Sequence, residues 1–118
     1  MIRILVVEDN QEKLQRVVTA ICEVPGCSME NIDTAHDALE AKIHFRESDY
    51  DLVLLDIALP ERSDKSPSPD GGIAVLQEVL DRDIYHTPRE VVGLTAFEEV
   101  LDKSCSQVCR RSVASHPL

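Results

Sequence analysis

Residues 51–60 of this 118-residue chain are DLVLLDIALP and contain its clearest buried strand. Its centre is an unbroken apolar run that Asp56 closes, which is typical of a β-strand buried on both faces in a parallel sheet. Residues 3–7 (RILVV) have the same character and are followed directly by Glu8 and Asp9. We therefore expect two buried parallel strands, each ending at acidic residues.

Segments with helical periodicity alternate with the strands. Asp9 or Asn10 can cap a first helix, and its apolar residues recur at helical spacing: Leu14, Val17, Val18, Ile21 and Cys22. A weaker strand is predicted at residues 31–35, and a fourth at residues 90–94, ending at Thr95. Strands that alternate with helices predict an α/β fold, a doubly wound parallel sheet covered on both faces.

Three further helices are predicted from apolar residues at intervals of three or four. Their apolar stripes, which we expect to face the sheet, are Ala35, Leu39 and Ile43 in the second helix, Ile73, Leu76 and Leu80 in the third, and Phe97, Leu101, Cys105 and Val108 in the fourth. Between them, residues 61–72 (ERSDKSPSPDGG) are rich in Ser, Pro, Asp and Gly and predict an extended loop.

Length and composition indicate a single acidic domain at residues 1–118. The 22 acidic residues outnumber the 12 Lys and Arg and give a net charge of −10, which disfavours direct binding of nucleic acid. The apolar runs are too short to cross a bilayer and no signal peptide is evident, so we expect a cytoplasmic chain without a membrane partner. The four cysteines lack zinc-site spacing and are expected to be reduced.

Acidic side chains gather where the predicted strands end. In an open α/β sheet, ligands bind beyond the carboxyl ends of the strands, where Glu8, Asp9, Asp56 and Thr95 are expected. Each acid alone has a simple structural explanation as a helix cap or turn residue. Three carboxylates at one edge repel one another unless a cation or a proton intervenes. A hard divalent cation with oxygen ligands, Mg²⁺, fits this requirement.

Four motifs together resemble the receiver domains of two-component response regulators. They are ILVVEDN at 4–10, DLVLLDIALP at 51–60, DGG at 70–72 and GLTA at 93–96, in the order of that family. The resemblance implies a flavodoxin-like α/β fold with five parallel strands in the order 2-1-3-4-5. It also implies that these motifs meet at one phosphorylation site.

The resemblance assigns a role to each residue of that site. Asp56 would be the phosphoacceptor, and Thr95 would donate a hydrogen bond to a phosphoryl oxygen. Mg²⁺ would be held by Glu8 (through water), Asp9, Asp56 and the backbone carbonyl of Ala58. The expected function is a switch phosphorylated by a partner histidine kinase or phosphotransfer protein. It would catalyse only its own phosphorylation and dephosphorylation, and an effector domain or a homodimer would complete the signal.

The C-terminal part, from about residue 104, departs from the family pattern. Receivers carry a Lys before a Pro at the end of the fifth strand, whereas this chain has His116 before Pro117. Two interpretations of His116 stay open, a replacement for that Lys and an ordinary C-terminal residue. The final helix is absent from the pattern, so either the chain ends before an effector or this region has diverged. The apolar sheet surface left uncovered predicts a dimer, or the exchange of a C-terminal element between chains.

Two other functions compete with a phosphorylated receiver. The first is a pseudo-receiver that keeps the acids, lacks the chemistry and acts as a protein-interaction module. The second is a Mg²⁺-dependent phosphohydrolase with Asp56 as nucleophile. That family has a second Asp two residues on, where this chain has Ala58, and it also has a larger cap domain, so we disfavour this alternative.

Overall fold

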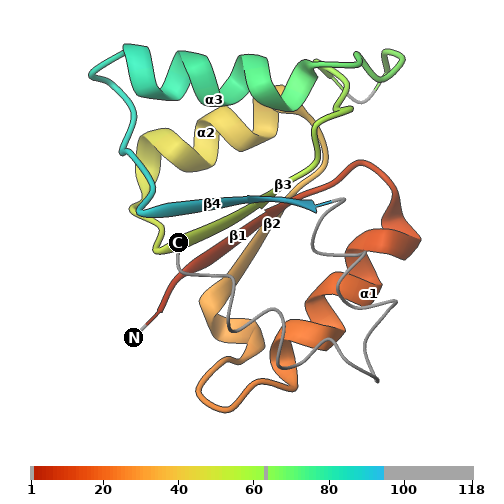
Figure 1. The fold of residues 1–118 in the computed structure, drawn as a ribbon, viewed down its shortest axis with the longest axis vertical. Coiled ribbons are helices and arrows are strands. Elements are labelled where there is room, and N and C mark those ends of the chain that lie inside the picture. The colour runs from red at the N-terminus through yellow and green to blue at the C-terminus, as the bar shows by residue number, and fades with distance from the viewer. Residues whose placement is uncertain (1, 63, 95–118) are drawn as a thin grey trace.

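The structure, a computed structural model, describes residues 2–62 and 64–94 and contains a four-stranded parallel sheet (Figure 1). The strand order is β2-β1-β3-β4, as in the predicted flavodoxin-like α/β fold. The strands are β1 (Ile4–Val7), β2 (Ile32–Ala35), β3 (Leu52–Leu55) and β4 (Glu90–Gly93). The helices are α1 (Gln11–Cys22), α2 (Ala38–Glu47) and α3 (Gly71–Asp81), with a short 3-10 turn η1 (Met29–Asn31). The predicted fourth helix and fifth strand lie outside the described residues, as does the region where the final helix was predicted to be absent.

Helices cover both faces of the sheet, with α1 on one side and α2 and α3 on the other (Figure 1). Successive side chains of a strand point to opposite faces, so each strand supplies two cores. Val53 and Leu55 belong to the core beneath α2 and α3, whereas Leu54 belongs to the core beneath α1. This two-sided burial explains the unbroken apolar runs of β1 and β3.

Helix α1 forms as its sequence predicts. The side chain of Asn10 caps it by accepting a 3.0 Å hydrogen bond from the backbone N–H of Lys13. Leu14, Val17 and Ile21 are buried against the sheet. The cap places the first turn of α1 directly beyond Glu8 and Asp9, so this helix borders the carboxyl end of β1.

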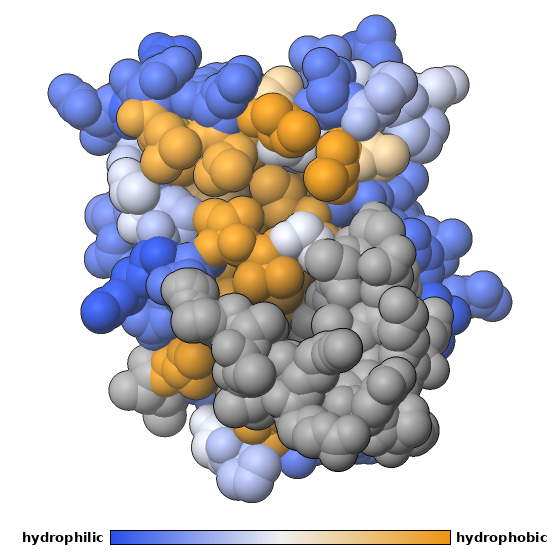
Figure 2. Space-filling view, in the orientation of Figure 1, coloured by the Kyte–Doolittle hydropathy of each residue, from blue (hydrophilic) through white to orange (hydrophobic). Residues whose placement is uncertain are grey.

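The predicted apolar stripes of α2 and α3 are only partly right. Ala35 is buried but belongs to β2, and Leu76 packs against the core, whereas the other predicted residues are exposed. Leu39 and Ile43 of α2 are 51% and 46% exposed, while the residues that face the core are Ala38, Ala41 and Phe45. In α3, Val75 and Val79 are buried, whereas Ile73 and Leu80 are 44% and 58% exposed. Both helices are apolar on more than one face, so periodicity alone did not identify the face that packs. Figure 2 shows the resulting apolar surface over α3 and β4.

The loop between β3 and α3 forms as predicted in its central part. An isolated antiparallel bridge joins Leu59 to Ser68 and gives the loop a narrow base. The helix after it begins at Gly71, close to the predicted position. Within residues 2–62 and 64–94, no helix combines the length and the hydropathy that a membrane crossing would need.

Candidate functional site

The structure brings Glu8, Asp9 and Asp56 together at the carboxyl ends of β1 and β3. One carboxylate oxygen from each residue lies within 4.8 Å of the other two. The two strands are neighbours in register, with Val7 opposite Leu55, so Glu8 and Asp56 occupy equivalent places beyond them. Backbone hydrogen bonding continues into the site, because the Asp56 N–H donates to the Val7 carbonyl at 3.0 Å. The strand pairing therefore sets the spacing of the carboxylates.

Glu8 is a buried acid with one unsatisfied oxygen. Its side chain is 1% exposed, and its Oε2 accepts a 3.0 Å hydrogen bond from the backbone N–H of Asn10. Its Oε1 is buried and accepts no hydrogen bond from residues 2–62 or 64–94, although the Nζ of Lys13 lies 3.7 Å away. Burial raises the pKa of Glu8 to about 7, and the negative charge of Asp56 adds to this effect. A buried carboxylate with a raised pKa and an unsatisfied oxygen can bind a cation or a proton.

Asp56 is also buried, and its carboxylate is oriented by the chain that follows it. Its Oδ1 accepts a 3.2 Å hydrogen bond from the backbone N–H of Ala58. Burial raises the pKa of Asp56, and the charge of Asp9 adds to the rise, while the Ala58 N–H and Lys13 oppose it. Burial thus disfavours the charged form of both acids when no metal ion is bound.

The cluster fits a hard divalent cation. All its donors are carboxylate oxygens, which Mg²⁺ prefers, and the unsatisfied Oε1 of Glu8 lacks the partner that a cation or its bound water would supply. Ala58 lies in the bend after Asp56, and the use of its carbonyl oxygen as a ligand stays a prediction. Thr95 and His116, the remaining predicted site residues, lie outside the described residues.

Two helix N-termini hold the segment after Asp56 in place. On one side, the Gly72 N–H donates a 2.7 Å hydrogen bond to the carbonyl oxygen of Ile57. On the other side, the first N–H groups of α2, those of Ala38 and Leu39, donate to the carbonyl oxygens of Pro60 and Glu61 at 2.9 and 3.1 Å. These bonds satisfy helix N–H groups that have no partner within their own helix. Any shift of the chain after Asp56 therefore disturbs both helices.

Sequence reasoning missed the residues that support the acids. Lys13 was not predicted to be a site residue, because a lysine in the first turn of a surface helix usually points into solvent. The contacts of Pro60 and Glu61 with α2 are made by the backbone and leave no trace in side-chain patterns. The Gly71-Gly72 pair did offer a signal, since adjacent glycines at a helix start indicate close backbone packing.

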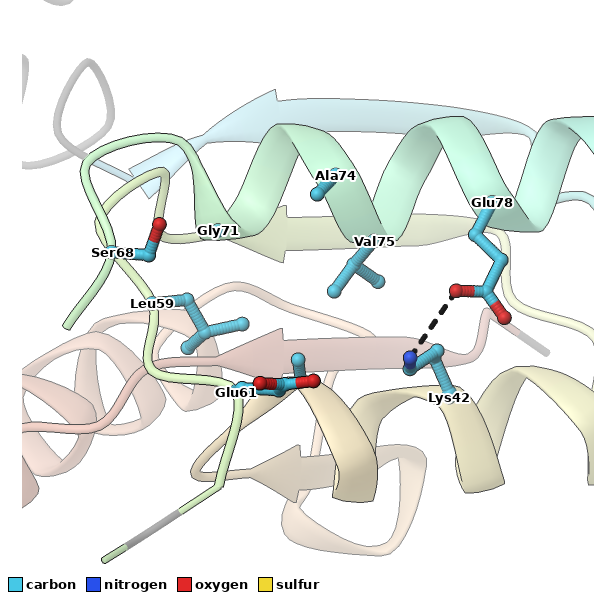
Figure 3. A pocket seen from close by; sticks show the side chains of 9 residues that line it. Lys42, Leu59, Glu61, Ser68, Gly71, Ala74, Val75 and Glu78 are labelled. Atoms are coloured by element: carbon cyan, nitrogen blue, oxygen red, sulfur yellow. Dashed lines mark hydrogen bonds and ion pairs between the residues drawn. The ribbon is translucent and has the colours of Figure 1, made fainter. Parts of the chain in front are cut away.

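A second feature, the groove between α2 and α3, lies apart from the acids (Figure 3). It has a volume of about 270 Å³ and an apolar floor that includes Leu59 and Val75. An ion pair of 3.2 Å between Lys42 of α2 and Glu78 of α3 crosses one end. The exposed Glu61 lies at the other end, on the loop that follows Asp56. The groove therefore adjoins the same segment that holds the acid site.

Comparison with protein families gives a match to the response regulator receiver domain over residues 4–107. The chain is 30% identical over 110 residues to "Uncharacterized protein y4jS" of Sinorhizobium fredii, covering 93% of this chain and 26% of that protein. It is 35% identical over 101 residues to the transcriptional regulatory protein DltR of Streptococcus agalactiae, covering 86% and 38%. The chain thus spans well under half the length of these curated relatives.

Solved structures of similar fold include two response regulators. The bacteriophytochrome response regulator AtBRR is 27% identical, with a TM-score of 0.58 over 88% of this chain and 75% of that one. The receiver domain of the Francisella response regulator 1452 is 20% identical, with a TM-score of 0.59 over 86% and 74%, and it supports the fold alone.

Proposed function

Since the chain belongs to the response regulator receiver domain family, we propose that it is a signalling switch that accepts a phosphoryl group on Asp56. The donor would be a histidine kinase or a phosphotransfer protein, and the cofactor would be Mg²⁺. The domain would catalyse only its own phosphorylation and dephosphorylation, in the cytoplasm. An effector domain or a second copy of the chain would receive the signal.

One observation carries this proposal, the convergence of three carboxylates of which two are buried. Buried carboxylates cost free energy unless a cation compensates them, so their retention at one strand edge needs a reason. Phosphoryl transfer supplies that reason, because it demands charge neutralisation and positioning more than covalent chemistry.

In the proposed reaction, a carboxylate oxygen of Asp56 attacks phosphorus in line with the donor's phosphorus–nitrogen or phosphorus–oxygen bond. That bond breaks, its electron pair leaves with the donor, and an acyl phosphate forms on Asp56. Bound Mg²⁺ would neutralise charge on the phosphoryl oxygens, with Glu8 and Asp9 among its ligands. The N–H of Ala58 holds the Asp56 carboxylate in one orientation, and Thr95 would donate a hydrogen bond to the product.

A titration with beryllium trifluoride, which mimics a phosphoryl group on a carboxylate, tests the proposal. With Mg²⁺ present, amide NMR signals of residues 56–58 should shift at one equivalent of ligand. Asp56→Asn should abolish the shifts. Asp51→Asn, at the other end of the same strand, is the matched control and should preserve them, since the amide oxygen can still accept from Arg3 N–H. Absence of shifts in the unmodified protein would contradict the proposal.

The groove between α2 and α3 favours one second candidate, a receiver that serves as an interaction module without phosphorylation. Its apolar floor and the exposed Ala74 at its side could accept a partner's side chain. The two candidates differ in one respect that the titration measures. An interaction module would not bind beryllium trifluoride at Asp56.

A further inference from the structure

Lys13 lies beside the carboxylate cluster and comes from a different element than the acids. It is in the first turn of α1, where the cap by Asn10 fixes its backbone. Its Nζ lies 3.7 Å from the buried Oε1 of Glu8, and its side chain is 33% exposed. The lysine side chain therefore extends from the solvent-exposed surface to the buried carboxylate of Glu8.

The charge of Lys13 acts on more than Glu8. It opposes the rise in the pKa of Glu8 and also that of Asp56, so its field extends over the acceptor carboxylate. The geometry agrees, because the oxygens of Glu8 and Asp56 belong to one cluster within 4.8 Å. Lys13 is a basic side chain that the structure pairs with this cluster through Glu8.

We propose that Lys13 supplies the cation that neutralises the phosphoryl oxygens on Asp56, a role that rests on the proposed function. A phosphoryl group adds negative charge and three acceptor oxygens beyond the strand ends, where the ammonium of the partly exposed Lys13 side chain lies beside Glu8. Lysine suits this task, since its flexible stem carries a compact charge with three donors. Helix α1 thus contributes a phosphate-binding cation to the same edge at which β1 and β3 contribute the acids.

A simpler role for Lys13 makes a different prediction. If the lysine only neutralises Glu8, then its removal frees that carboxylate for Mg²⁺, and phosphorylation should proceed at the same rate or faster. If it binds the phosphoryl group, its removal should tighten Mg²⁺ binding and yet slow phosphorylation. Tighter binding follows in both cases because two cations no longer compete for Glu8. The sign of the change in rate separates the two roles.

The experiment compares the unmodified chain with Lys13→Met, Lys13→Arg and the control Lys42→Met, whose ion pair with Glu78 lies in the groove. The phosphorylation rate with acetyl phosphate at saturating Mg²⁺ is followed by intact mass, and Mg²⁺ affinity is measured by NMR titration. We expect Lys13→Met to be about tenfold slower, since one charge-assisted contact is lost. Lys13→Arg should recover most of the rate, and Lys42→Met should leave it unchanged.

A Lys13→Met variant that is labelled as fast as the unmodified chain would overturn the role of Lys13 while leaving Asp56 as acceptor. No labelling of the unmodified chain would instead overturn the proposed function, and this inference with it. Lys13→Gln, which keeps a polar side chain at the helix start, provides the same comparison if the Met variant melts early.

Discussion

The backbone N–H of Gly72 donates a 2.7 Å hydrogen bond to the carbonyl oxygen of Ile57, so α3 begins against the residue that follows Asp56. A Cβ atom on Gly72 would overlap the backbone carbonyl oxygen of Asp56. Backbone atoms at this position cannot move aside without displacing Asp56 itself. The glycine is therefore a structural requirement of the acid site.

Gly72→Ala should lower the free energy of unfolding by about 1–3 kcal/mol, although alanine is the better helix former, because the added methyl group overpacks the contact. Urea denaturation measures the change. Gly93→Ala is the control, since a Cβ there meets no atom of the described part of the chain within 4 Å. Equal stabilities for the two variants would show that α3 does not pack as closely as described.

The stability of the metal-free protein should fall as pH rises. Burial raises the pKa of Glu8 from its ordinary value of 4.5 to about 7 in the fold, so between these pH values the folded state holds a proton that the unfolded state has lost. This extra proton on Glu8 contributes on the order of 3 kcal/mol to the free energy of unfolding. The contribution is fully present below about pH 4.5 and is lost as pH rises through 7. The raised pKa of Asp56 acts in the same direction. Urea unfolding between pH 5.5 and 8.5 in a chelator, with roughly unit steps in pH, measures this slope, and a flat or rising profile would contradict it.

Glu8→Gln should stabilise the metal-free protein at pH 8 by about 1–2 kcal/mol and flatten the pH profile, because it removes a buried charge. The amide oxygen of the glutamine can still accept from the Asn10 N–H. Thermal melting in a chelator measures the effect. Glu12→Gln, an exposed acid in the first turn of α1, should leave the profile unchanged, and a gain of the same size in both variants would point to net charge instead.

Added Mg²⁺ should raise the melting temperature of the unmodified protein, and more so at pH 8 than at pH 6. The ligands must be deprotonated to bind, so the burial that raises the pKa of Glu8 to about 7 also weakens metal binding below that pH. Asp9→Asn should reduce the response at both pH values. A melting temperature that Mg²⁺ leaves unchanged at both pH values would argue against a metal site.

The fold was predictable where burial leaves an unambiguous pattern in the sequence. The apolar runs of β1 and β3 reflect burial on both faces, and their neighbouring positions in the sheet follow from the alternation of strands and helices. Helix α3 was harder, because Ile73 and Leu80 form a stripe as apolar as that of Val75 and Val79. Only the packed structure identifies which stripe faces the core.

The acid cluster was predictable because its members follow directly after strands that lie side by side. Glu8 and Asp56 need no side-chain modelling to be placed together, since strand register alone aligns them. Lys13 was not predictable in the same way, because its approach to Glu8 depends on the rotamer of a long side chain. The roles of Thr95 and His116 stay predictions.

Phosphorylation of Asp56 can be measured by mass spectrometry after incubation with acetyl phosphate and Mg²⁺. We expect the intact chain to gain the mass of one phosphoryl group, fragmentation to locate that group on Asp56, and Asp56→Asn to gain none. A chain that gains no mass, or an Asp56→Asn variant labelled as fully as the unmodified protein, would contradict the account.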